Sequence, residues 1–141
     1  MIIAVDFDGT LVEHRYPEIG KEILFAFETL RALQKENHQL ILWTIRTGKE
    51  LEESIEYCRK KGVEFYAVNS SYPEEKFEPG NVSRKINADL FIDDRNIGGL
   101  PGWGEIWHML NLHESSEFEN YMIQKQKAGF LKGLFNRIFS K

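Results

Sequence analysis

Two pairs of aspartates stand where carboxylates could act together on one substrate. Asp6 and Asp8 are separated by one residue, and Asp93 and Asp94 are adjacent. Positions i and i+2 of a straight strand face the same side, so Asp6 and Asp8 could reach one cavity. A carboxylate can attack phosphorus and thereby divide hydrolysis into two easier steps. The second carboxyl of the pair could protonate the leaving oxygen and later take a proton from water.

The combined charge of these four acids points to a metal ion. With Lys85 as the nearby cation, they would repel a phosphate dianion unless a positive ion offset them. A hard divalent cation with oxygen ligands, usually Mg²⁺, offsets the charge and bridges to the substrate. The Asp93-Asp94 pair alone is typical of a solvated turn, but together with Asp6 and Asp8 it favours magnesium-dependent phosphate chemistry.

The elements that would position these acids alternate between strands and helices. Short apolar runs predict buried strands at residues 2–6, 39–44, 63–68 and 88–93. Apolar spacing and capping signals predict helices over 21–36, from Thr47 to just before Gly62, and from about Trp103. This order predicts an α/β fold with a parallel sheet and helices on both faces. Functional groups in such sheets gather at the carboxyl ends of strands.

The residues at those strand ends resemble the four motifs of the haloacid dehalogenase (HAD) superfamily. The resemblance covers roughly residues 2–96 and rests on Asp6-Phe7-Asp8-Gly9-Thr10, Thr44, Lys85 and Asp93-Asp94. It implies a three-layer, Rossmann-like HAD core and a phosphatase-type enzyme, because the dehalogenating branch lacks an acid at the position of Asp8. No cap domain has room, since residues 45–84 hold one helix, one strand and a loop.

The resemblance also implies a role for each motif residue. Asp6 would be the nucleophile that forms an aspartyl-phosphate, and it would also bind Mg²⁺. Asp8 would be the general acid/base and offer its backbone carbonyl to the metal. Thr44 would hydrogen-bond the phosphoryl group, and Lys85 would neutralise it. Within the pair at 93–94, Asp93 would bind the metal directly, while Asp94 would share that role or hold a metal-bound water.

Some of these assignments have rivals in the sequence. Thr47 could replace Thr44, but Thr47 stands where a capping box would begin a helix. Arg84 and Lys76 compete with Lys85, whose spacing before the acid pair is similar to that of compact family members.

Substrate contacts would come from two loops, residues 11–20 and 69–83. Gly9 leaves backbone N–H groups available to an anion. Arg46 could hold a substrate group bidentately, or it could be an ordinary solvated loop arginine. Other candidate contacts, each taken alone more typical of plain loop surface, are His14, Arg15, Tyr16 and Tyr72.

The composition is that of an ordinary globular protein, with 42% hydrophobic and 28% charged residues. One cysteine, Cys58, excludes an internal disulfide and a cysteine-built zinc site. No apolar run approaches the roughly 18 residues of a membrane span, and the apolar stretch at residues 1–5 is too short for a signal peptide. We therefore expect a cytoplasmic protein.

Charge divides the chain into an acidic body and a basic tail. Residues 127–141 carry four basic residues and no acid, so the rest has a net charge of −8 against −4 overall. An acidic body argues against general nucleic-acid binding. We expect a catalytic domain at 1–112 and a helical extension at 113–141. Its apolar stripe would pack on its own domain, in a homodimer, or on a membrane surface.

The expected partner is a small phosphorylated substrate or an exposed phosphate on a larger molecule. Two alternatives use the same residues, namely a phosphotransferase on this scaffold and a non-catalytic phosphoacceptor of the receiver type. In a receiver the phosphorylated Asp ends a later strand, which is the reverse of this arrangement. A binding protein with a decayed site is disfavoured because the acids, Thr44 and Lys85 are all present.

Overall fold

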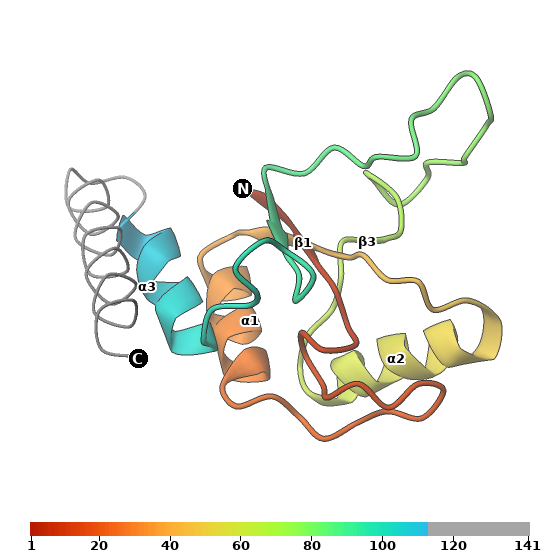
Figure 1. Cartoon of the computed structure of the whole chain (residues 1–141). Coiled ribbons are helices and arrows are strands. Elements are labelled where there is room, and N and C mark those ends of the chain that lie inside the picture. The colour runs from red at the N-terminus through yellow and green to blue at the C-terminus, as the bar shows by residue number, and fades with distance from the viewer. Residues whose placement is uncertain (113–141) are drawn as a thin grey trace, which may run out of the picture. The chain divides into compact units, whose positions relative to one another are not determined.

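The computed structural model describes residues 1–112, which form an α/β fold with a four-stranded parallel sheet and three helices (Figure 1). The elements in chain order are β1 (Ile2–Val5), α1 (Ala26–Lys35), β2 (Gln39–Leu42), α2 (Gly48–Lys60), β3 (Ala67–Val68), β4 (Leu90–Ile92) and α3 (Trp103–Leu112). Met1–Trp103 is one compact unit, and a second begins at Gly104. The predicted extension at 113–141, with its apolar stripe, lies outside the described residues.

The strand order places β1 in the interior of the sheet. The order is β3-β2-β1-β4, and every neighbouring pair is parallel. Val5, the last residue of β1, lies in register with Leu42 of β2 and Ile92 of β4. The residues that follow these three strands therefore emerge side by side at one edge of the sheet.

Helices α1 and α2 cover one face of the sheet. Ile3, Val5 and Phe7 alternate along β1 and its extension, and all three are fully buried. The ring of Phe7 packs edge-on against Tyr57 of α2 at a centroid distance of 6.4 Å. Phe27 of α1 meets the same tyrosine ring at 5.8 Å. The two helices thus share one apolar layer with this face.

Our expectation of helices on both faces of the sheet is wrong for the opposite face, where the connection between β3 and β4 contains no helix. The buried cluster on this face consists of Ala4, Ile41, Ala67 and Ile86, against which Trp43 and Phe91 pack while remaining partly exposed. The connection from β3 to β4, residues 69–89, runs without a helix. Pro73, Pro79 and Gly80 interrupt this segment, and it lacks the apolar period that a covering helix needs.

Other predicted elements are confirmed with shorter bounds. Helix α1 begins at Ala26 instead of residue 21, because the preceding chain pairs with the first loop through Ile23 N–H and the Leu11 carbonyl (2.9 Å). Strand β3 is limited to Ala67–Val68. Helix α2 has the predicted extent, with Thr47 at its N-cap, but the Thr47 side chain makes no capping hydrogen bond.

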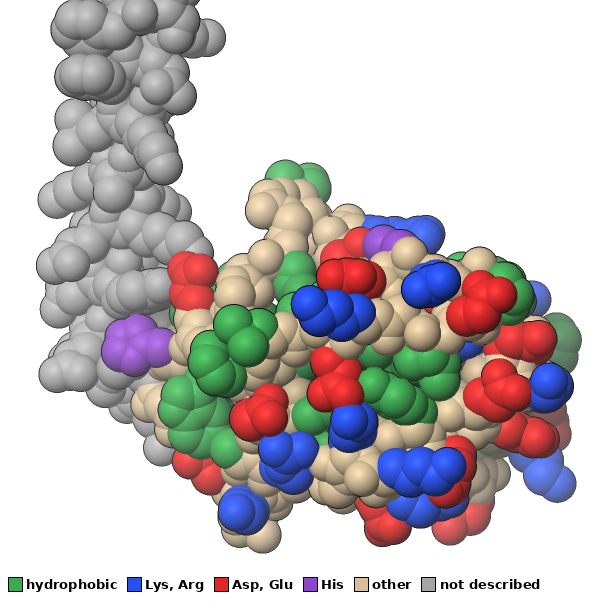
Figure 2. All heavy atoms as spheres, turned by 90° about the horizontal axis from the view of Figure 1, so that it is seen from below, with side chains coloured by type: hydrophobic (Ala, Val, Ile, Leu, Met, Phe, Trp, Pro, Cys, Tyr) green, Lys and Arg blue, Asp and Glu red, His purple; other side chains and the backbone are tan. Residues whose placement is uncertain are grey.

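Acidic and basic side chains are interspersed on the face that Figure 2 shows. Ion pairs within α2 are of this mixed kind, such as Arg59–Glu56 at 2.7 Å. Exposed pairs of this type contribute at most about 1 kcal/mol each.

Among residues 1–112, no helix is long and apolar enough to cross a membrane.

Candidate functional site

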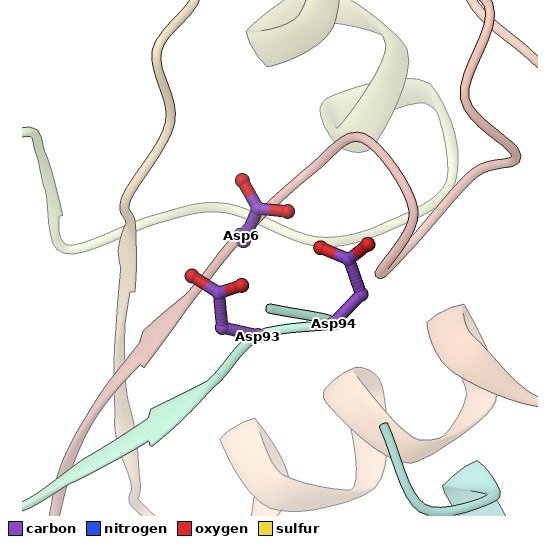
Figure 3. Close-up of side chains that lie close together, drawn as sticks. All are labelled: Asp6, Asp93 and Asp94. Carbon is purple, nitrogen blue, oxygen red and sulfur yellow. The ribbon is translucent and has the colours of Figure 1, made fainter. Parts of the chain in front are cut away.

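Three of the four predicted acids converge beyond the ends of β1 and β4. Carboxylate oxygens of Asp6, Asp93 and Asp94 all lie within 4.8 Å of one another (Figure 3). The Asp6 N–H donates to the carbonyl of Ile92 at 3.0 Å, which continues the strand pairing up to the site. The side chain of Asp8 is not part of this group. The predicted gathering of acids is thus observed for one member of the first pair and both members of the second.

Thr10 links the carboxylate of Asp6 to the backbone of Asp94, a role that the motif alone did not reveal. Its buried hydroxyl donates to Asp6 Oδ2 at 3.0 Å and accepts the backbone N–H of Asp94 at 3.1 Å. Its carbonyl accepts the indole N–H of Trp103 at 2.9 Å. The side chain of Thr10 therefore sets the spacing between the residues that follow β1 and β4.

Asp94 carries one oxygen that needs a partner. Its Oδ2 lies 2.8 Å from Nε2 of His14, whereas its Oδ1 is buried and has no hydrogen-bond partner among the described residues. Leaving a buried carboxylate oxygen unpaired costs free energy, and a bound cation or its water would remove that cost. His14, which the sequence offered as a possible substrate contact, instead orients Asp94.

The His14 and Asp94 side chains pack so closely against residue 9 that only glycine fits there. Its φ is +90°, in the region that favours glycine. A Cβ there would lie 2.2 Å from His14 Nε2 and 2.6 Å from Asp94 Oδ2. Gly9 therefore makes room for the side chains of His14 and Asp94. Contrary to expectation, its own N–H is not available to an anion, because it donates to the carbonyl of Val12 at 2.6 Å.

Burial raises the pKa of Asp6 to about 6. Hydrogen bonds from the Phe7 backbone and the Thr10 hydroxyl oppose this rise, while the charges of Asp93 and Asp94 add to it. The carboxylate is therefore held in an environment that disfavours its own charge. A divalent cation bound among the three acids would favour the ionised form.

Asp8 is engaged by Arg46 in a buried bidentate ion pair. The Nε and Nη2 atoms of Arg46 donate to Asp8 Oδ2 and Oδ1, each at 2.7 Å. Remaining donors reach the carbonyls of Pro17 at 3.0 Å and Glu18 at 2.9 Å. The bond to Asp8 raises the pKa of Arg46. Arg46 is fully buried, so neither expectation for it, a free substrate contact or a solvated loop residue, describes what is observed.

Thr44 and Lys85 line the same cleft as Asp6, Asp8 and Asp93. The cleft has a volume of about 830 Å³, and its wall includes Asp6, Asp8, Thr44, Lys85, Asp93 and Arg95. The rivals Thr47 and Lys76 do not line it, whereas Arg84 does. The structure describes no hydrogen bond or ion pair from the Lys85 side chain, which is exposed.

Asn69 positions Thr44, and sequence reasoning gave Asn69 no role. Its side-chain oxygen accepts the Thr44 N–H at 2.8 Å, and the Thr44 hydroxyl oxygen accepts the Arg46 N–H at 3.2 Å. These contacts leave the hydroxyl proton of Thr44 available to a ligand. Asn69 immediately follows β3, so the rule that functional groups gather at strand ends was the signal that could have found it.

A solved structure of a conserved protein from Bacteroides thetaiotaomicron is similar to this chain. The two sequences are 60% identical, the match covers 82% of this chain and 93% of that one, and the TM-score is 0.75. The description of that protein states no activity. No family model and no curated protein matches the chain.

Replacing Arg46 should strongly destabilise the fold. Arg46→Ala would leave Asp8 buried without its partner, which typically costs about 3–5 kcal/mol. Urea unfolding of Arg46→Ala and of Arg59→Ala provides the comparison, because Arg59 forms only surface ion pairs, with Glu56 and Glu64. Equal midpoints for the two variants would contradict the structural role of Arg46.

Asp6→Asn should raise the thermal midpoint of the metal-free protein at pH 7.5. Because the folded-state pKa of Asp6 is near 6 and the usual value is near 4, ionised Asp6 destabilises the fold above pH 6. After discounting for partial exposure, we expect a gain of about 1 kcal/mol from Asp6→Asn. The gain should shrink as the pH falls from 6 towards 4, where folded Asp6 is protonated. Calorimetry in chelator at pH 7.5 and 4.5 tests this, and a constant difference would contradict it.

Proposed function

The chain belongs to the same family as the conserved Bacteroides thetaiotaomicron protein, and we propose that it is a magnesium-dependent phosphomonoesterase with Asp6 as nucleophile. One observation carries this proposal. Carboxylate oxygens of Asp6, Asp93 and Asp94 lie within 4.8 Å of one another, and Asp6 and Asp93 line a cleft whose wall also holds Thr44 and Lys85. This set of groups matches what the resemblance to the HAD superfamily implies, and we attribute to the chain a HAD-type core without a cap domain.

The residues present fit a magnesium ion. Three carboxylates supply hard oxygen ligands, and the unpartnered Oδ1 of Asp94 is an oxygen that gains a partner when a cation or its water is present. Asp6 and Asp93 would hold the ion, with Asp94 as a third ligand or as the acceptor for a metal-bound water. When bound, Mg²⁺ supplies positive charge that lets a phosphate dianion approach the acids.

The reaction would proceed in two displacements at phosphorus. A carboxylate oxygen of Asp6 attacks the phosphorus of a monoester, the bond to the ester oxygen breaks, and that oxygen leaves as an alcohol after taking a proton from the Asp8 carboxyl. Water then attacks the aspartyl-phosphate and gives a proton back to Asp8, and this step releases inorganic phosphate and restores the Asp6 carboxylate. The Thr44 hydroxyl donates to a phosphoryl oxygen, and the exposed ammonium of Lys85 offsets its charge.

The proton source in this scheme is Asp8, and Arg46 controls its availability. Both Asp8 oxygens accept hydrogen bonds from Arg46, so neither can donate a proton in this arrangement. Acid catalysis would require the Asp8 side chain to turn away from the guanidinium towards the cleft that it already lines. We propose that substrate binding accompanies this rotation, while Pro17 and Glu18 retain Arg46.

Chelation should abolish phosphate release, and Mg²⁺ should restore it. The reason is the repulsion between the clustered carboxylates and a phosphate dianion. Activity on a panel of phosphomonoesters is measured in excess chelator and again after Mg²⁺ is added. Full turnover in chelator would rule out the metal assignment.

Asp6→Asn should remove activity almost completely, since attack on phosphorus needs its carboxylate. Asp8→Asn should lose the ~10²–10⁴-fold that general acid–base catalysis contributes, and less on aryl phosphates whose leaving groups need no proton. Initial rates on an alkyl and an activated aryl phosphate test both variants, with circular dichroism as the check on folding.

Beryllofluoride, which mimics an aspartyl-phosphate, should be found attached to Asp6 in a crystal structure. Attachment to Asp93 or Asp94 instead would favour the receiver-like phosphoacceptor. Phosphate release that falls when alcohols are added, with transfer to the alcohol, would favour the phosphotransferase.

A further inference from the structure

The cleft extends from the acid site over the face of the sheet that carries no helix. Because the 69–89 connection has no helix, Trp43 and Phe91 are only partly covered, and both line the cleft. Thr44, which lines the same cleft, follows Trp43, and Asp93 of the acid group lies two residues after Phe91. An aromatic floor thus begins where the carboxylates end.

A third aromatic ring reaches the cleft from the connection itself. Phe77 lines the cleft with 47% of its surface exposed, and the guanidinium carbon of Arg84 lies 4.6 Å from the ring centroid. The connection is tied together by hydrogen bonds from Ser71 N–H to Glu75 Oε2 (2.5 Å) and from Asn87 N–H to Ser71 Oγ (3.1 Å). Phe77 therefore lies on a loop that is held together by internal hydrogen bonds.

The charges along the cleft suit an anion with an apolar body. Lys85, Arg84 and Arg95 line the cleft and are exposed. The Glu75 carboxylate, which also lines it, accepts the Ser71 N–H, and the other carboxylates stand at the strand ends. A cleft of about 830 Å³ is far larger than a phosphate group requires. Flat rings stack on aromatic side chains and on guanidinium planes, which explains the use of exposed aromatic residues beside cations.

We propose that the substrate is a phosphate monoester whose leaving group carries a flat heteroaromatic ring, as in a nucleoside monophosphate. The phosphate lies among Asp6, Thr44 and Lys85, and the ring lies on the aromatic floor against Phe77. This inference rests on the proposed phosphomonoesterase function and adds the class of leaving group.

The test compares two phosphate monoesters, one with and one without a heteroaromatic base on the ribose. Adenosine 5′-monophosphate and ribose 5-phosphate release the same kind of primary alcohol, so chemistry at phosphorus is matched. Base stacking predicts a kcat/KM roughly 10-fold or more higher for the nucleotide with the full-length chain and Mg²⁺. Phe77→Ala should remove most of this ratio by lowering kcat/KM for the nucleotide alone.

Tyr72→Ala is the matched control, because Tyr72 lies on the same connection, is also 47% exposed and does not line the cleft. It should leave the ratio unchanged. Equal efficiency for the two substrates would overturn the inference while leaving the phosphomonoesterase in place. So would a Phe77→Ala defect of the same size for both substrates, as expected if another part of the chain or a partner protein covers the floor. Hydrolysis of neither substrate nor of an activated aryl phosphate would instead overturn the proposed function.

Discussion

Burying the guanidinium of Arg46 requires hydrogen-bond acceptors for its N–H groups. The loop between β1 and α1 provides all of those observed. Asp8 supplies two oxygens, and the carbonyls of Pro17 and Glu18 supply two more. Removing a charged pair from water is costly, and only this many well-aligned hydrogen bonds can offset the cost. The loop after β1 is therefore attached to the residues after β2, and the path of the loop past the acids follows from that attachment.

The acid site itself works against the stability of the fold. Asp6 is partly buried beside two other carboxylates, and Asp94 holds an oxygen with no partner among residues 1–112. Such costs persist where surrounding contacts determine the geometry, here Thr10 between Asp6 and Asp94 and His14 against Asp94. The protein thus places its least favourable charges where a cation would relieve them.

The sequence could predict what depends on periodicity and on strand ends. The four strands, the extent of α2 and the meeting of Asp6 with Asp93 and Asp94 follow from apolar patterning and parallel topology. Pairings between distant loops have no such local signal. The Arg46–Asp8 pair links residues 38 positions apart, and His14 and Asp94 are separated by 80. Which side chains pair in this way depends on the path of the loops over the sheet, and the periodicity of the sequence does not predict that path.

The connection between β3 and β4 has a consequence for how this scaffold can diversify. Its interior makes no ladder hydrogen bonds with the sheet, and the strands at its ends, Ala67–Val68 and Leu90–Ile92, are held by β2 and β1. Changes of length or sequence between residues 72 and 82 would leave the register of β1 and β4 intact, since loops tolerate insertion better than paired strands. A loop of different sequence could therefore replace this segment and change which substrates bind, while the aspartates that follow β1 and β4 keep their positions.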